Sequence, residues 1–208
     1  MKNKSYLITF AVLSIAMTTI AQQTGTFTDT RDGKVYKTIK IGTQTWMTEN
    51  LAYKTPNGCW AYNDDEKNVA IYGYLYNWET AESVCPTGWL LPGEFEFSTM
   101  INYLGGKDSA GCKLKEVGNL HWKSNENEIF KNNVPITNST GFTALPGGLR
   151  NDWEIFSDIG RDGWWWSIDD QNSSEEAKDL LIEFNGGHAF IYSEKKECGL
   201  SVRCIKDK

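Results

Sequence analysis

Cysteine and histidine are the residue types in this chain that could do covalent or metal chemistry. The 208 residues include five cysteines and two histidines, His121 and His188. A thiolate beside an imidazole can act as a nucleophile, and clustered cysteine and histidine can hold zinc. The two histidines lie far apart without metal-ligand spacing, and no serine lies in a nucleophile elbow. The sequence therefore predicts no catalytic residue, no metal and no cofactor.

The N-terminus indicates whether the chain is exported and therefore whether its cysteines meet an oxidising compartment. Lys2 and Lys4 precede an apolar run over residues 6–20, and a small-residue cleavage site follows it. The run is about 15 residues long, whereas a membrane-spanning helix needs ~20. We therefore expect a signal peptide over residues 1–21, with an uncleaved anchor as the alternative. The mature chain, residues 22–208, is predicted to be a single exported domain in the periplasm, on the outer surface or secreted.

An exported chain with five cysteines is expected to form disulfides. The odd number leaves at least one cysteine unpaired or intermolecular, and the sequence cannot fix the connectivity. Cys85 with Cys204 is the favoured pair, because it would close most of the domain into one loop worth roughly 4–5 kcal/mol of chain entropy. Cys59, Cys112 and Cys198 contain at most one further pair, and a leftover thiol is expected to pack as a small buried hydrophobe.

Charge and composition limit the partners. The net charge of −6 repels phosphate backbones, so nucleic acid is not an expected partner. Nine residues each of Trp, Tyr and Phe with 19 glycines suit an irregular fold with a heavy aromatic core, and they also suit a carbohydrate-binding surface. No segment of the mature chain is long and apolar enough to span a membrane.

The aromatic residues that could bind a ligand lie in the second half of the chain. If residues 164–166, all tryptophan, form a strand, Trp164 and Trp166 share one face and Trp165 points away. Two interpretations stay open, in which the whole run is core or one side stacks on a sugar ring. A polar-aromatic loop over residues 150–153 could flank the same surface. The predicted ligand-binding residues are Arg150, Asn151, Asp152, Trp153 and Trp165.

The elements that must position these residues are short. Residues 24–41 alternate as a hairpin, and apolar periodicity predicts helices over 77–84 and 93–104. Residues 54–71 are polar and predict a loop, while 107–140 are weakly patterned. Short strands are expected at 142–145, 164–167, 180–184, 189–192 and 200–205. In the last of these, Arg203 is expected to make structural hydrogen bonds to carbonyls or a carboxylate.

Several motifs, taken in order, resemble one known family. They run through nearly all of the chain that follows the leader. The motifs are Ile41-Gly-Thr-Gln-Thr-Trp-Met-Thr-Glu-Asn-Leu51, Gly73-Tyr-Leu-Tyr-Asn-Trp78, Cys85-Pro-Thr-Gly-Trp-Leu-Leu-Pro92, Gly141-Phe-Thr-Ala-Leu-Pro-Gly-Gly148, Trp165-Trp-Ser167 and Ser201-Val-Arg-Cys204. This pattern is similar to the Fibrobacter succinogenes major paralogous domain family of exported bacterial proteins, found largely in the Bacteroidota and Fibrobacter group.

The resemblance implies an α+β fold like that of C-type lectins and formylglycine-generating enzymes. Such a fold has two short helices, several short antiparallel strands and irregular loops. In those folds a cysteine after the first helix pairs with one in the last strand, which supports Cys85–Cys204. Two departures are visible: Cys59 lacks the second cysteine that family members often carry nearby, and Leu90 stands where the family has histidine.

The function predicted from these features is a non-catalytic binding or adhesion module of the cell envelope. Its ligand would be a glycan or a surface protein, although the calcium-dependent sugar motifs Glu-Pro-Asn and Gln-Pro-Asp are absent. One alternative is a structural envelope subunit without a small ligand. Another is an oxidase related to formylglycine-generating enzymes, which would need copper and a redox-active cysteine pair. Cys198 and Cys204 are close in sequence, but the predicted disulfide requires Cys204.

Overall fold

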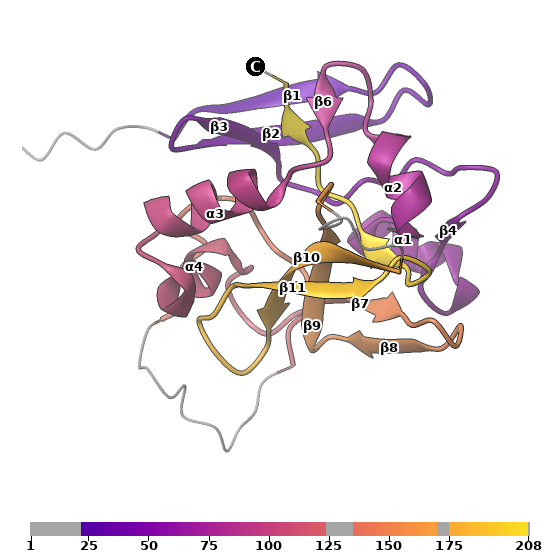
Figure 1. The fold of residues 1–208 in the computed structure, drawn as a ribbon. Coiled ribbons are helices and arrows are strands. Elements are labelled where there is room, and N and C mark those ends of the chain that lie inside the picture. The colour runs from indigo at the N-terminus through magenta and orange to yellow at the C-terminus, as the bar shows by residue number, and fades with distance from the viewer. Residues whose placement is uncertain (1–21, 124–134, 170–174, 208) are drawn as a thin grey trace, which may run out of the picture.

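The computed structural model describes residues 22–123, 135–169 and 175–207. The predicted signal peptide, residues 1–21, lies outside these ranges. Two β-sheets stand one above the other, and four α-helices pack at their sides, so the predicted α+β class is confirmed (Figure 1). Within the described ranges, none of the helices has the length and apolar content needed to cross a membrane.

The upper sheet of Figure 1 has the strand order β1-β2-β3-β13-β6. Its first two strands form the predicted hairpin, in which Thr24 lies opposite Ile39. The last strand of the chain, β13, is inserted between β3 and β6 and pairs with both in antiparallel fashion. The strands are β1 (Thr24–Thr28), β2 (Val35–Ile41), β3 (Gln44–Met47), β6 (Trp89–Leu90) and β13 (Ile205–Lys206).

The lower sheet follows the path β11-β10-β9-β12-β5-β4, and β7 and β8 extend from β9. Most pairs are antiparallel, but β9 pairs in parallel with β12 and with β7. The strands are β4 (Cys59–Trp60), β5 (Leu75–Tyr76), β7 (Gly147–Arg150), β8 (Phe156–Ile159), β9 (Asp162–Trp166), β10 (Glu176–Glu183), β11 (Phe190–Lys195) and β12 (Leu200–Ser201). The strand expected at 142–145 is reduced to a single bridge between Lys115 and Ala144.

Two of the helices are the predicted ones. Asn77 caps α2 (Trp78–Val84) by accepting a hydrogen bond from the backbone N–H of Thr80 at 3.1 Å. The side chain of Glu96 caps α3 (Glu94–Tyr103) by accepting from the N–H of Gly93 at 3.0 Å. Each cap satisfies a backbone donor that the first turn of a helix leaves open.

The other two helices were not predicted. The segment 54–71, expected to be a loop, instead contributes β4, the 3-10 helices η1 (Tyr62–Asp64) and η2 (Glu66–Asn68), and the start of α1 (Val69–Tyr72). The second is α4 (Lys107–Leu114), in the weakly patterned region. Its central Gly111 disfavours a helix locally, but a Cβ there would lie 2.3 Å from the carbonyl oxygen of His188. Close packing against the segment before β11 therefore requires this glycine.

The core consists of two aromatic-rich clusters. The three consecutive tryptophans alternate between them as predicted. Trp165 is fully buried in the cluster that includes Trp46 and Phe97, while Trp166 belongs to the other and Trp164 packs against that one. The strand alternation thus distributes one short sequence over both sides of the lower sheet.

The disulfide between Cys85 and Cys204 is present, with the two Cα atoms 5.9 Å apart and a sequence separation of 119. It joins the end of α2 to the segment that links β12 in the lower sheet to β13 in the upper sheet. All five cysteines lie in the described ranges, and Cys59, Cys112 and Cys198 form no second disulfide. The predicted pairing is confirmed.

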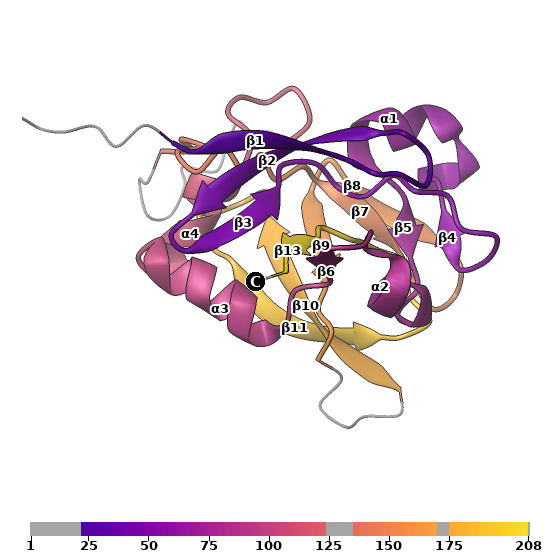
Figure 2. The ribbon, with the colours of Figure 1, turned by 90° about the horizontal axis from the view of Figure 1, so that it is seen from above.

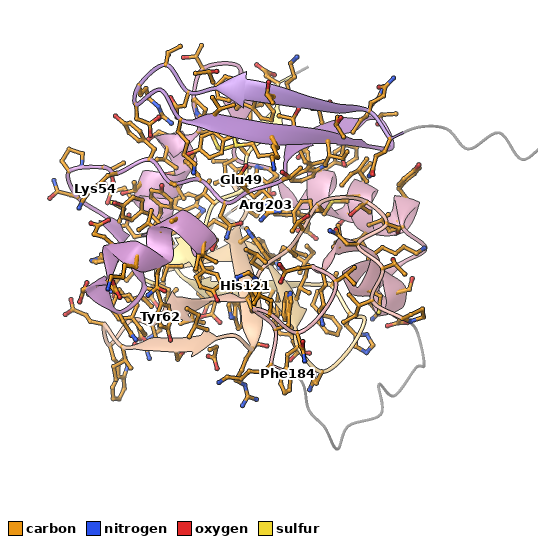
Figure 3. All side chains as sticks on the ribbon, turned by 180° about the vertical axis from the view of Figure 1, so that it is seen from behind. Glu49, Lys54, Tyr62, His121, Phe184 and Arg203 are labelled. Carbon is orange, nitrogen blue, oxygen red and sulfur yellow. A yellow bond between two sulfur atoms is a disulfide. The ribbon has the colours of Figure 1, made fainter. Side chains whose placement is uncertain are left out.

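The preceding residue, Arg203, is completely enclosed between the sheets (Figure 3). Its Nε and Nη2 donate to the side-chain oxygen of Asn50 at 3.1 and 2.6 Å, and its Nη1 donates to the carbonyl of Phe142. The guanidinium also lies 4.2 Å from the ring centre of Phe142. Arg203 forms no ion pair with any described carboxylate. Its predicted structural role is confirmed.

Asn50 completes this arrangement, which we call the Asn50–Arg203 hub. The same Asn50 oxygen accepts from the indole N–H of Trp165 at 2.8 Å. Its amide nitrogen donates to the carbonyl of Tyr72 at 2.8 Å and to the hydroxyl of Ser201 at 3.1 Å. One side chain therefore satisfies polar groups from α1, β9 and the C-terminal segment. Burial lowers the pKa of Arg203.

Removing the disulfide should strongly destabilise the fold. We expect Cys85→Ser to lower the free energy of unfolding by roughly 3–5 kcal/mol, because the unfolded chain regains the freedom of a long closed loop. Urea denaturation of the oxidised protein measures this. Cys59→Ser is the matched control and should change it by less than about 1 kcal/mol. Equal unfolding midpoints for the two variants would contradict the expected role of the bond.

Removing the central amide of the hub should also be costly. Asn50→Ala leaves Arg203 and the indole N–H of Trp165 buried without their acceptor. We expect a loss of about 3–5 kcal/mol, as for breaking other buried charged networks. Thermal and urea unfolding check this against Asn119→Ala, which removes an exposed amide. A loss below about 1 kcal/mol in Asn50→Ala would show that the hub relaxes without cost.

Candidate binding site

Four of the five predicted ligand-binding residues lie together at the end of the β7–β8 hairpin, which projects from the lower sheet (Figure 1). The turn is fixed by Asn151, whose side-chain oxygen accepts from the N–H groups of Trp153 at 3.0 Å and Ile155 at 2.9 Å. Such a side-chain-to-backbone turn is typical of asparagine. Asn151 therefore determines the shape of the hairpin end.

The charged residues of this loop are held by protein partners. The guanidinium of Arg150 lies 4.3 Å from the ring centre of Trp60, and its Nη2 is 3.2 Å from a carboxylate oxygen of Glu154. Asp152 binds the ammonium of Lys195 at 2.6 Å, and this hydrogen bond lowers the pKa of the carboxyl group. These contacts tie the hairpin end to β4 and to β11, so it is held from both sides.

The side chain of Trp153 projects from this hairpin end into solvent. Its exposed fraction is 78%, whereas the other eight tryptophans are buried or half-buried. The neighbouring Ile155 is 56% exposed. We call these two side chains the apolar tip. An exposed indole on a hydrogen-bonded turn presents a large apolar face with little freedom left to lose on binding.

Trp165 does not belong to this surface. It is fully buried, and its indole N–H is engaged by Asn50 at 2.8 Å. Its ring packs in the core cluster that includes Trp46 and Phe142, with the Phe142 ring centre 6.3 Å away. The expectation that Trp165 contacts a ligand is corrected: it is a core residue.

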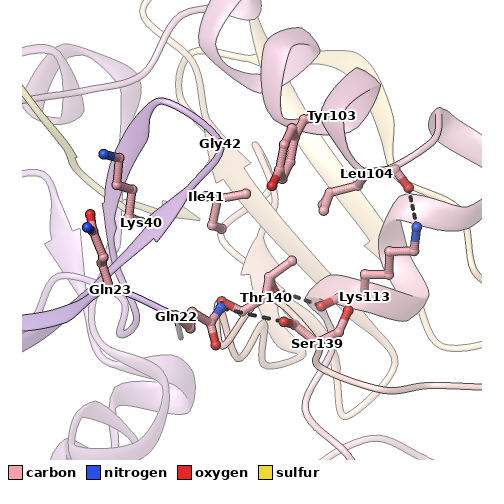
Figure 4. A pocket seen from close by; sticks show the side chains of 10 residues that line it. All are labelled: Gln22, Gln23, Lys40, Ile41, Gly42, Tyr103, Leu104, Lys113, Ser139 and Thr140. Carbon is pink, nitrogen blue, oxygen red and sulfur yellow. Dashed lines mark hydrogen bonds between the residues drawn. The ribbon is translucent and has the colours of Figure 1, made fainter. Parts of the chain in front are cut away.

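A cavity that was not predicted from the sequence lies at another corner of the molecule. The cavity has a volume of about 750 Å³ and lies beside the turn between β2 and β3, the end of α3, and α4 (Figure 4). Lys40, Tyr103 and Lys113 line it. Its residues come from segments far apart in the chain, so no local motif marks it. Among the described lining residues, two lysines occur without an acidic residue.

The two histidines occupy separate places. His121 lies 2.8 Å from a carboxylate oxygen of Glu116 and edge-on to the ring of Tyr72. His188 lies 3.4 Å from Asp108 and stacks on Phe190. No group of three or more metal-ligating side chains occurs in the described ranges. Because Cys204 is bonded to Cys85, it is not available to form a redox pair with Cys198.

A buried carboxyl group on β10 has an unusual environment. Asp179 is fully buried, and neither of its side-chain oxygens has a hydrogen-bond partner among the described residues. Burial, aided by the nearby charge of Glu194 and opposed by Lys178, raises its pKa to about 8. The group is enclosed by the sheet and offers no surface to a ligand. Its consequence is for stability.

Comparison with known proteins gives a family match. The family model described as the Fibrobacter succinogenes major domain matches residues 39–206. The matched range includes the hairpin end, the Asn50–Arg203 hub and both cysteines of the disulfide. No curated protein and no solved structure matches the chain.

Asp179 should make stability depend on pH. Its folded pKa lies above its unfolded value, so the folded state keeps a proton that the unfolded state loses. The contribution of Asp179 to the free energy of unfolding is therefore fully present below about pH 4 and is lost as the pH rises towards 8. We expect Asp179→Asn to remove this fall and to be more stable than the parent protein at pH 8–9 by roughly 2–4 kcal/mol.

Urea unfolding at a series of pH values measures the effect. The control is Asp64→Asn, which changes an exposed carboxyl group and should keep the parent's pH profile. Parallel profiles for the parent and Asp179→Asn would show that this carboxyl group is not the source of the pH dependence.

Proposed function

Because this chain belongs to the Fibrobacter succinogenes major domain family, we propose that it is an exported, non-catalytic binding or adhesion module of the bacterial cell envelope. The ligand is a glycan or a surface protein, and the apolar tip of the β7–β8 hairpin contacts it. The observation that carries this proposal is the 78% exposure of Trp153 in a chain whose other tryptophans are covered.

The physical chemistry of the tip favours binding. An exposed indole keeps apolar surface in contact with water, which is unfavourable. Burying that surface against an apolar face of a partner lowers the free energy of binding. The turn formed by Asn151 and the ion pair between Asp152 and Lys195 hold the loop before a ligand arrives. A preformed loop loses little conformational entropy on binding. Sugar rings and the apolar patches of protein surfaces both offer a flat face that an indole can cover.

The disulfide supports export, since such bonds persist mainly in oxidising compartments. Its position also supports the C-type-lectin-like fold, in which a cysteine after a helix pairs with one near the final strands. Fold similarity does not define a ligand, so the proposal depends on the exposed loop. A structural envelope subunit is the second candidate, favoured by Ile155, because an aliphatic side chain next to Trp153 suits a protein contact.

A glycan array tests the proposal directly. We expect the protein to bind a subset of glycans and Trp153→Ala to weaken that binding at least about tenfold, equivalent to ~1.4 kcal/mol. The melting temperature should not change, because the removed ring is exposed. Phe95→Ala is the matched control, since Phe95 is 70% exposed on α3, away from the hairpin.

Binding to no glycan would remove the glycan version. Capture of envelope proteins by the parent protein, compared with Trp153→Ala, then tests the protein version. If Trp153→Ala and Phe95→Ala retain the same partners at the same yield, the apolar tip is not the binding surface.

A further inference from the structure

We propose that the cavity beside α3 and α4 is a second binding site, which takes an acidic saccharide with carboxylate groups. This site is independent of the apolar tip. In both Figure 1 and Figure 2 the helices α3 and α4 lie on one side of the molecule and the β7–β8 hairpin lies on the other. Its volume of about 750 Å³ falls within the range of small-molecule sites.

An aromatic ring forms one wall of the cavity. Tyr103, in the last turn of α3, is 66% exposed and leans over the turn between β2 and β3 (Figure 4). A Cβ on Gly42 would lie 3.3 Å from this ring, so the glycine allows the ring to approach the turn. Gly42 also has a φ of 60°, which favours glycine. The turn and the ring together form a firm wall with an open aromatic face.

The charge of the cavity is positive in an acidic protein. Lys40 and Lys113 line it, and none of the described residues that line it is acidic, although the chain has a net charge of −6. Neither lysine forms an ion pair with a described residue. A concave surface with one sign of charge concentrates ligands of the opposite sign. The two ammonium groups therefore select an anion.

The position of Lys113 is fixed. Its Nζ donates to the carbonyl oxygen of Leu104 at 2.7 Å, which anchors it to the end of α3 (Figure 4). An ammonium group has three protons to donate, so this bond leaves two. Lys40 is exposed on β2 at another wall of the cavity. The two cations thus approach the same space from different elements, as a ligand with more than one negative group requires.

Uncharged residues make up the rest of the described lining. Gln22, Gln23, Ser139 and Thr140 are polar, and Ile41 and Leu104 add apolar surface. The side-chain amide of Gln22 donates to the carbonyl of Thr140, which joins the start of β1 to this loop. Hydroxyl and amide groups beside an aromatic ring match the hydroxyl groups and apolar face of a sugar. A simple anion would use the lysines and leave this wall and the ring of Tyr103 without a role.

Calorimetric titration of the full chain tests the site with three probes. They are an oligogalacturonate, the neutral galactose oligosaccharide of the same length, and inorganic phosphate. We expect only the oligogalacturonate to bind measurably, with an affinity that falls as sodium chloride is raised. Lys40→Gln and Tyr103→Ala should each weaken binding about tenfold. Lys37→Gln, which removes another exposed lysine from β2 outside the cavity, should not.

Four results would overturn the proposal. Equal affinity for the neutral oligosaccharide would show that the lysines do not select the ligand. Equal affinity for phosphate would show an anion site that ignores the sugar. Equal weakening by Lys37→Gln and Lys40→Gln would show non-specific attraction to the surface. Trp153→Ala should leave this binding intact, and its loss in that variant would place the saccharide at the apolar tip instead.

Discussion

A buried guanidinium without a carboxylate partner is the constraint on which this structure depends. The hydrogen bonds of Arg203 to described residues all go to neutral oxygens, since the side chain is buried and no described acidic side chain pairs with it. The side chain of Asn50 and the carbonyl of Phe142 must therefore be held at fixed positions. Both lie in loops, which would otherwise have considerable freedom. The hydrogen bonds of the Asn50–Arg203 hub hold these two loops in place, as the hydrogen bonds of a helix or sheet would do elsewhere.

The disulfide acts on the same short segment. Cys204 follows Arg203 directly, so a covalent bond to the end of α2 and a polar network to three other elements meet at neighbouring residues. This segment passes from the lower sheet to the upper one, where β13 completes the pairing between β3 and β6. The final residues thus connect both sheets. A fold of short strands gains its rigidity from this connection more than from any long element.

The hub and the disulfide stabilise the centre of the fold, so surface segments on opposite sides can carry different side chains. The β7–β8 hairpin end offers an exposed indole and an aliphatic side chain on a fixed turn. The opposite corner offers two lysines, a tyrosine ring and neutral polar groups around a cavity. The first surface suits an apolar face, and the second suits an anion with hydroxyl groups. Neither surface includes residues of the hub, so each can change without loss of the frame.

The sequence by itself determined the features that depend on neighbouring residues. Alternation over β1 and β2, periodicity and capping in α2 and α3, and the separation of Trp164 and Trp166 from Trp165 are local patterns. The family motifs supported the Cys85–Cys204 pairing that loop closure already favoured, and they added the α+β class. Residues 151–153 were correctly expected to lie in a loop, because turn-forming asparagine acts on its own backbone, whereas Arg150 ends strand β7.

Only the tertiary structure decided which of these residues reach solvent. Trp153 and Trp165 have the same side chain, and their difference in exposure arises because Trp165 packs in a core cluster with residues distant in sequence, such as Trp46 and Phe97. The helix α4 forms around Gly111 because the chain near His188 packs against it, and local propensity opposes it. The cavity is assembled from segments that are distant in sequence and meet only in the folded chain. Burial and concavity are properties of long-range contacts, and such contacts leave no pattern among adjacent residues.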